Sequence, residues 1–285
     1  MLFRRIIINA IFAGVVAGLL LSLVQILTVN PIIFAAEAYE VMEDSSSPAV
    51  QAIREIHTIE PKIETTASEG HHDDHGHSQV HSQSHSQVHS QSHSNHQHSH
   101  DGWAPEDGAE RTSYTVFANI FAGIGFAAIL LSLMSQIQMQ SFTRLSSAKG
   151  LLWGVGGFMA FFVAPSIGMP PEIPGMIAAP IEHRQLWWML AVLGVGLGLL
   201  LLAFAPIRWK SLGIVAIVLP YLVGVPHLHG GAFDHPDPLV VQELMTLQQD
   251  FILYSGFSNL LLWLALGSLC GWLLNRRVFS ANERD

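Results

Sequence analysis

Six long apolar runs decide what this chain can fold into. They cover approximately residues 6–29, 114–135, 150–168, 186–206, 211–228 and 251–274. A helix needs about 20 mostly apolar residues to cross a hydrocarbon core roughly 30 Å thick. Only 12% of the residues are charged, against roughly 25% in soluble domains, which excludes a single soluble core. The sequence therefore predicts an all-α integral membrane protein with about six transmembrane helices.

The basic residues predict the orientation of these helices. Cytoplasmic loops are enriched in lysine and arginine, and the bias is read from short loops and from the ends of the spans. Nine basic residues fall at alternate ends of the apolar runs: Arg4, Arg5, Arg144, Lys149, Arg208, Lys210, Arg276, Arg277 and Arg284. The other four lie in much longer connections. Both termini are therefore predicted to be cytoplasmic in a multi-pass protein of the cell inner (cytoplasmic) membrane.

The predicted organisation has four parts. Residues 1–30 form the first transmembrane helix, 31–113 an external loop, 114–275 a membrane bundle of five further helices, and 276–285 a cytoplasmic tail. Arg4 and Arg5, followed by an apolar run and then Ala36-Glu37-Ala38, are also features of a cleaved signal peptide. The run of about 24 residues exceeds the roughly 7–15 of a signal peptide, so we favour a retained helix.

Proline and glycine mark irregular places in the spans. Pro220 and Pro226 lie in the fifth run and predict a kinked or partly unwound helix, because proline breaks the helical hydrogen-bond ladder. Ile11-Phe-Ala-Gly14 recurs as Ile120-Phe-Ala-Gly123. Internal repeats are common in transporters, but apolar sequences also produce such echoes by chance. The single cysteine, Cys270, is expected to be a small buried apolar residue.

A histidine-rich tract, predicted to be disordered, lies within the external loop. Residues 71–100 contain 11 of the 16 histidines: His71, His72, His75, His77, His81, His85, His89, His93, His96, His98 and His100. Its other residues are mostly serine, glutamine and acid, which cannot bury enough apolar surface to fold alone. Imidazole binds divalent zinc, copper, nickel and cobalt, so the tract predicts metal capture without strong selectivity. The alternative is a pH-responsive polar spacer, because histidine titrates near neutrality.

Carboxylates and imidazoles also occur where the apolar runs end on the external side. The candidate metal ligands at this mouth are Glu37, Glu40, Glu172, His227 and His229. Mixed oxygen and nitrogen ligands suit cobalt or nickel, which we expect as a transported substrate; no fixed cofactor is expected. The spacing from His229 to Asp234-His235 is similar to a motif of nickel/cobalt permeases, but Gly230-Gly231 interrupts the helix that carries it there.

Several motifs together resemble the CbtA family of predicted cobalt transporter subunits. They are the basic start FRRI, P-I-I-x-x-A-E-x-Y-E at 31–40, P-P-E-x-P-G at 170–175, R-Q-x-W-W at 184–188 and the Pro226-His227 pair. The resemblance covers the whole chain. It implies cobalt uptake, a link to cobalamin metabolism and a small His-bearing membrane partner, CbtB. His229 departs from the family pattern, so the resemblance implies no role for it.

Three function classes follow from these features. The first is a membrane subunit of an uptake transporter for a divalent transition metal, cobalt before nickel or zinc. The second is a membrane-bound metal or pH sensor or scaffold, which the short cytoplasmic loops disfavour. The third is an intramembrane enzyme, for which Ser258 is a weak candidate nucleophile without a histidine at matching depth. Nucleic-acid binding and nucleotide hydrolysis are excluded, because the chain has neither a basic surface nor a P-loop.

Overall fold

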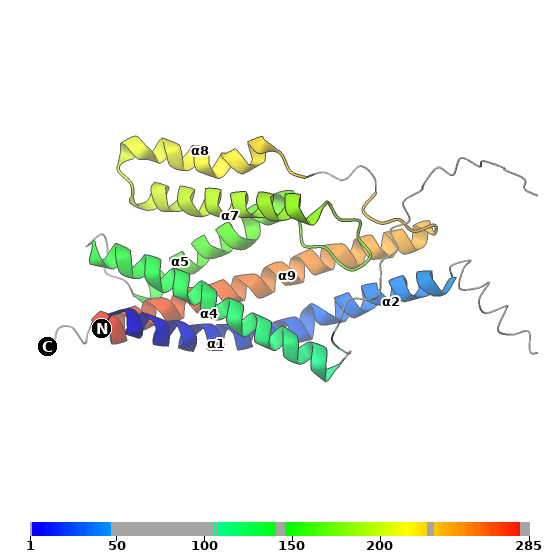
Figure 1. Cartoon of the computed structure of the whole chain (residues 1–285), viewed down its shortest axis with the longest axis horizontal. Coiled ribbons are helices and arrows are strands. Elements are labelled where there is room, and N and C mark those ends of the chain that lie inside the picture. Colours follow the sequence, from blue (N-terminus) through cyan, green and yellow to red (C-terminus); the bar gives the residue numbers. More distant parts are fainter. Residues whose placement is uncertain (1, 47–104, 106–107, 141–145, 227–230, 280–285) are drawn as a thin grey trace, which may run out of the picture. The chain divides into compact units, whose positions relative to one another are not determined.

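The computed structural model describes residues 2–46, 105, 108–140, 146–226 and 231–279, and every regular element in these ranges is helical. The helices are α1 (Leu2–Thr28), α2 (Asn30–Ser46), α4 (Ala109–Met139), α5 (Ser147–Phe158), the π-helix η1 (Met159–Val163), α6 (Ala164–Gly168), α7 (Ile181–Phe204), α8 (Ile207–Val223), α9 (Pro238–Leu273) and the π-helix η2 (Leu274–Phe279). Figure 1 shows their arrangement. The predicted all-α class is confirmed.

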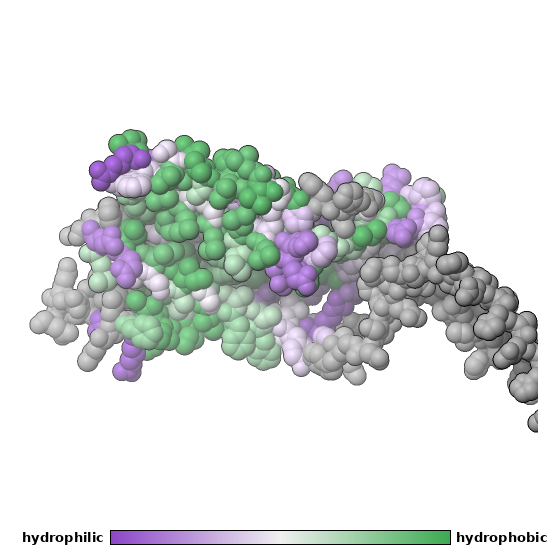
Figure 2. Space-filling model, turned by 45° about the horizontal axis from the view of Figure 1, so that its top comes forward, coloured by the Kyte–Doolittle hydropathy of each residue, from purple (hydrophilic) through white to green (hydrophobic). Residues whose placement is uncertain are grey.

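Five helical segments in the described ranges are long and apolar enough to cross a membrane. They are Phe3–Thr28, Ala109–Met139, Ser147–Gly168, Ile181–Phe204 and Pro238–Arg276. They match five of the six runs expected from the sequence. Large apolar side chains on them, such as Phe121 and Leu152, are about 70% exposed, as lipid-facing residues are. In Figure 2 the apolar surface covers the middle of the visible face, and polar residues gather toward its ends.

The remaining predicted span, 211–228, corresponds to α8, which is not one of these five. This helix has 17 residues and contains Pro220. At 1.5 Å per residue it is roughly 26 Å long, slightly less than the hydrocarbon core. It ends at Val223, and Gly224 follows with a φ of 95°. The structure thus supports five spans by length and composition, with α8 as a shorter helix packed along α7 (Figure 1).

Glycines bring α5 and α9 into backbone contact. A Cβ added to Gly150 would lie 2.2 Å from the carbonyl oxygen of Gly267, and one added to Gly267 would lie 2.3 Å from that of Gly150. Gly154 faces the backbone of Trp263 in the same way, and Gly271 faces that of Ser146. Inside a membrane, association depends on close van der Waals packing, so side chains larger than hydrogen are excluded from this interface.

The repeated Ile-Phe-Ala-Gly sequence forms part of the contact between α1 and α4. Gly14 lies against the backbone of Gly123 and Ile124, and Gly18 lies against that of Asn119. Beside this contact, the Asn119 side-chain amide donates to Ser22 Oγ at 3.1 Å and to Gln25 Oε1 at 2.7 Å. The repeated Ile-Phe-Ala-Gly sequence therefore contributes to helix packing, and the polar side chains next to it form hydrogen bonds with one another.

An aromatic cluster fills the space between α4, the α5–η1 segment and α9. Trp263 is buried and packs against Phe126 and Phe161 with ring centroids about 5 Å apart. Cys270 lies about two helical turns further along α9. It is fully buried against α4, as expected for a small apolar residue. This core lies toward the end of the bundle where α1 begins and α9 ends (Figure 1).

Side-chain hydrogen bonds link the two proline-containing helices, α6 and α8, to their neighbours. Pro165, in the first turn of α6, follows the π-helical turn η1, and Pro220 lies inside α8. The Tyr221 hydroxyl donates to the carbonyl oxygen of Ala164 at 2.9 Å, and the Trp187 indole N–H donates to that of Pro220 at 3.3 Å. Carbonyl groups near both irregular turns thus receive side-chain donors, as an apolar solvent requires. The helix α8 is continuous through Pro220 and ends at Val223, so the partial unwinding that was one expectation does not occur at this proline.

Two helices extend beyond the predicted boundaries of the spans. After a break at Val29 the chain remains helical to Ser46, although residues from 31 onward were expected to be loop. The last long helix begins at Pro238, although its apolar run begins at 251. Asp237 caps it by accepting from the Leu239 N–H at 2.8 Å. The sequence-based boundaries were too short because these polar helical turns pack on each other instead of in lipid.

Candidate functional site

The helical extensions and two connecting segments form a polar cap at the end where α2 and the start of α9 lie. The cap consists of α2, the N-terminal part of α9, residues 169–180 and residues 231–237. Its small core contains Ala36, Ile173, Phe233 and Leu244, all buried. Tyr39 and Phe251 pack around this core. The cap therefore holds three of the candidate ligands of the mouth, Glu37, Glu40 and Glu172.

Gln248 of α9 fixes the 169–180 segment in the cap. Its side chain is buried, accepts from the Ile173 N–H at 3.2 Å and donates to the carbonyl oxygen of Pro171. A backbone bond from the Ile177 N–H to Ala232 O, at 3.0 Å, joins this segment to residues 231–237. The Pro-Pro-Glu-x-Pro-Gly motif is thus anchored on both sides.

Glu37 forms a bidentate ion pair with Arg111. Arg111 Nη1 donates to Glu37 Oε2 at 2.8 Å, and Nη2 donates to Oε1. The Arg111 guanidinium also lies 5.1 Å from the ring centroid of Phe34. Two parallel, charge-assisted N–H···O bonds are stronger than one and also fix the relative orientation of the two side chains. The pair therefore links α2 to the start of α4 in a defined orientation.

Glu172 pairs with Arg184 through a single contact, which joins the 169–180 segment to α7. Arg184 Nη2 lies 2.5 Å from Glu172 Oε2, and both side chains are roughly one quarter to one third exposed. Because Glu37 and Glu172 each have an arginine partner, a cation entering here would compete with an existing guanidinium. Two of the candidate ligands are therefore compensated in this conformation.

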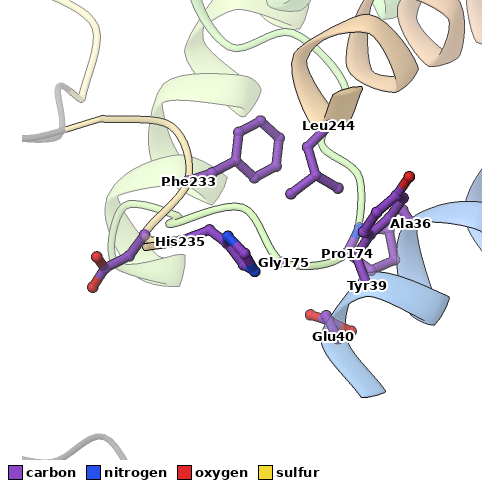
Figure 3. Close-up of a pocket in the computed structure, with 9 residues that line it drawn as sticks. Ala36, Tyr39, Glu40, Pro174, Gly175, Phe233, His235 and Leu244 are labelled. Carbon is purple, nitrogen blue, oxygen red and sulfur yellow. The ribbon is translucent and has the colours of Figure 1, made fainter. Parts of the chain in front are cut away.

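Glu40 lies in a different setting, beside a small cavity of about 20 Å³. The cavity is lined by Ala36, Tyr39, Glu40, Pro174, Gly175, Phe233, Asp234, His235 and Leu244. In Figure 3 the His235 imidazole and the Glu40 carboxylate point toward the same space beside Gly175. Gly175 has a φ of 81°, which a side chain would strain, and a Cβ there would contact the Glu40 side chain at 3.5 Å.

The other candidate ligands lie outside the described residues. These are His227, His229 and the eleven histidines of the 71–100 tract. Within the ranges that the structure describes, no three histidine, cysteine, aspartate or glutamate side chains gather to hold a metal ion. A site shared by Glu37, Glu40, Glu172 and His227 therefore stays a prediction.

Comparison with known proteins assigns the family. The chain matches the family described as "Probable cobalt transporter subunit (CbtA)" over residues 3–275. The chain belongs to the CbtA family. No curated protein and no solved structure matches significantly. The match agrees with the motif resemblance and supports membrane location, transport and cobalt as the implied substrate of this CbtA-family chain.

A second, much larger hollow in the described part of the CbtA-family chain is separate from the cap and apolar. It has a volume of about 730 Å³ and lies between α4, the α5–η1 segment, α7 and Trp263 of α9. Lys149 is the one charged residue among its lining residues, and no carboxylate or imidazole lines it. A hollow without oxygen or imidazole ligands does not suit a divalent cation, so the chemistry of a metal site points back to the cap.

The enzyme hypothesis receives no support at Ser258. Its side chain is fully buried, and its hydroxyl donates to the carbonyl oxygen of Tyr254 in the preceding helical turn at 2.7 Å. This intrahelical bond is the usual behaviour of a serine in a transmembrane helix. Membership of a transporter family also implies that the chain is not an enzyme.

Sequence reasoning missed four residues that shape the cap. Arg111 was used for topology and Arg184 for topology and the R-Q-x-W-W motif, although each neutralises a candidate ligand. Gln248 was not selected, and His235 was set aside together with the permease-like spacing. The motif R-Q-x-W-W, twelve residues after Glu172, carried a signal for one of these ion pairs. Nothing in the sequence indicates the 74-residue separation between Glu37 and Arg111.

Proposed function

We propose that this CbtA-family chain is the membrane subunit through which a transporter takes up a divalent transition metal, with cobalt as the first choice. The family match over residues 3–275 carries the proposal. The chemistry of the cap supports it, because carboxylates and an imidazole occur where the helices emerge. Such mixed ligands suit cobalt or nickel and release them more easily than thiolates would.

We propose six crossings with both termini in the cytoplasm. The start of α1 and the end of α9 lie at the same end of the bundle (Figure 1), which supports an even number of crossings. Besides the five long spans, α8 packs along α7 through Gly194, Gly198 and Gly213, and supplies the sixth. Arg208 and Lys210 in its first turn agree with a cytoplasmic start.

We propose that the external His-rich tract concentrates metal and that the mouth admits it. The tract is unselective, so its removal should reduce uptake at scarce metal and matter little at abundant metal. Deletion of residues 71–100, with uptake measured across metal concentrations, tests this. Equal loss of uptake at both extremes would make the tract part of the pathway itself.

The mouth is proposed to contain Glu37, Glu40, Glu172 and His227. In the structure, Arg111 is paired with Glu37 and Arg184 with Glu172. A metal ion that binds either carboxylate would therefore displace the arginine or share the carboxylate with it. Loss of a ligand should reduce uptake at all metal concentrations, unlike loss of the tract. The variants Glu37→Gln, Glu172→Gln and His227→Ala test this, each with membrane levels checked and with the exposed Glu243→Gln as a matched control.

A small His-bearing membrane subunit similar to CbtB is proposed as the partner, on the strength of the family resemblance. Expression of the chain with and without such a subunit, followed by cobalt uptake, tests this. Uptake that is equally fast from the chain alone would remove the partner from the proposal.

The alternative is a membrane-bound metal or pH sensor, or a scaffold, that binds metal outside without transporting it. Uptake of cobalt, nickel and zinc, compared in a deletion strain with and without the chain, separates the two functions. Restored cobalt uptake supports the transporter. Metal binding to the purified chain without restored uptake of any of the three metals would favour the sensor or scaffold.

A further inference from the structure

We infer that Glu40 and His235 form the first ordered binding site for a hydrated divalent transition-metal ion in the cap. This inference rests on the proposed transport function and selects ligands within it. Of the four proposed mouth residues it selects Glu40 of α2 as the first to bind, and it adds His235 of the 231–237 segment, which lines the same cavity (Figure 3).

The charges around the cap favour Glu40 over the other two glutamates. Glu37 and Glu172 are each neutralised by an arginine. Within the described part of the chain, Glu40 has no basic partner, and no lysine or arginine lines its cavity. Asp234 lines the same cavity and adds a second negative charge. A cation approaching the cap therefore meets uncompensated negative charge here.

His235 is oriented by the main chain of Asp237. Its Nδ1 lies 3.0 Å from the Asp237 backbone N and 3.4 Å from the Asp237 backbone O. The N–H of Asp237 donates to Nδ1 in one tautomer, and Nδ1–H donates to the carbonyl in the other. In the second tautomer Nε2 carries the free lone pair that a metal needs. Backbone bonds of this kind fix the orientation of metal-binding histidines.

The cavity has room for the ion itself, and the water molecules bound to the ion would lie on the solvent side, where Glu40 is exposed. Its volume of about 20 Å³ holds about one water molecule. The apolar cluster of Phe233 and Leu244 closes one side, and the backbone of Gly175 lies against the Glu40 side chain. One carboxylate and one imidazole leave the other coordination positions to water. This agrees with the absence of any three-ligand group in the described residues.

A site with two protein ligands binds weakly, which suits the entrance of a transporter. Conduction requires binding strong enough to collect the ion and weak enough to release it. Oxygen and imidazole ligands accept Co²⁺, Ni²⁺ and Zn²⁺, so the site recognises this class of ion instead of one metal. Selection among the three would occur beyond it.

The binding test uses the full-length chain with the eleven tract histidines replaced by glutamine, so that the tract does not mask a weak site. Cobalt chloride is titrated calorimetrically into this purified parent and into its Glu40→Gln, His235→Gln and double variants. Loss of an outer-shell partner alone weakens metal sites about 10–100-fold, so each single variant should lose at least about tenfold in affinity. The double variant should lose little more, because both residues hold one ion.

Matched controls are Glu243→Gln and His183→Gln, two exposed residues outside the cavity lining. Both should bind cobalt as the parent does, and all variants should unfold at the same temperature as the parent. Cobalt affinity unchanged in either Glu40→Gln or His235→Gln would overturn the site. A parent that binds no cobalt would overturn it as well.

Uptake in cells separates this inference from the proposed function. Reduced cobalt uptake in Glu40→Gln and His235→Gln, with normal uptake in the two controls, supports both. Normal uptake in the cavity variants leaves transport standing and removes the site. Binding that depends on Glu40 and His235 in a chain that restores no uptake leaves the site standing and removes transport.

Discussion

The contact between α5 and α9 offers a sharp test of the packing argument. In Gly267→Ala, the new methyl group would lie 2.3 Å from the Gly150 carbonyl oxygen and 2.6 Å from the Gly154 backbone N. Ordinary carbon contacts are about 3.5 Å, so the two helices must separate by about 1 Å. Neither backbone atom can rotate away as a side chain can.

The expected cost follows from three effects. Overpacking in a tight core costs about 1–3 kcal/mol, and separation also weakens Cα–H···O contacts worth about 0.5–1 kcal/mol each. Alanine regains about 1 kcal/mol of helix propensity relative to glycine. The net destabilisation of Gly267→Ala is therefore about 2 kcal/mol. For a chain of this size that lowers the melting temperature by roughly 4–8 °C.

The chain carries its own reporter for this measurement. Cys270 is the single cysteine, is fully buried and lies one helical turn from Gly267. A thiol-reactive fluorophore therefore reads out thermal unfolding of the purified protein directly. Gly125→Ala is the matched control, because a Cβ at that exposed position of α4 meets nothing within 4 Å. Melting of Gly267→Ala within about 1 °C of the control would refute the packing argument.

Three further outcomes are expected. If the ion pair between Glu37 and Arg111 is structural, Glu37→Arg alone should reduce cobalt uptake, and the double variant Glu37→Arg with Arg111→Glu should restore it. If Glu37 is instead a metal ligand, cobalt uptake should stay reduced in the double variant. In a background without the native cysteine, an impermeant thiol reagent should label a cysteine at position 85 in intact cells and one at position 145 only after permeabilisation; the reverse would invert the topology. Tyr221→Phe removes a hydroxyl that donates to a carbonyl of α6 and should cost about 1 kcal/mol in the same melting assay, and an unchanged melting temperature would show that this hydrogen bond contributes nothing.

The spans were predictable because a bilayer imposes a simple rule on the sequence. A helix that crosses it must be apolar for about 20 residues, and five such segments are present as expected. The exception is α8, whose 17 residues and internal Pro220 make length a poor guide. Whether α8 crosses the membrane depends on the helix it packs against, and its glycine contacts with α7 can be seen only in the structure.

The helical extensions were less predictable because each has few apolar residues, and these pack on the other extension instead of in a continuous apolar stripe. Ala36 and Tyr39 face Leu244 across the cap, but in the sequence they stand among acidic residues that suggest a loop. Local signals did exist at the starts of both elements. Pro31 follows Asn30 in α2, and Pro238 follows the capping Asp237 in α9. Proline in the first turn after such residues is typical of a helix N-terminus.

The candidate site shows the same division between composition and geometry. Residue types at the ends of the spans were sufficient to select Glu37, Glu40 and Glu172 as a group, but only the structure separates them. Arginines from α4 and α7 pair with two of the three, and no local pattern encodes the 74-residue separation between Glu37 and Arg111. Of these three carboxylates, Glu40 is the one that has no arginine partner among the described residues. That difference makes His235, which lines the same cavity as Glu40, a better partner for a metal ion than its place in the sequence suggested.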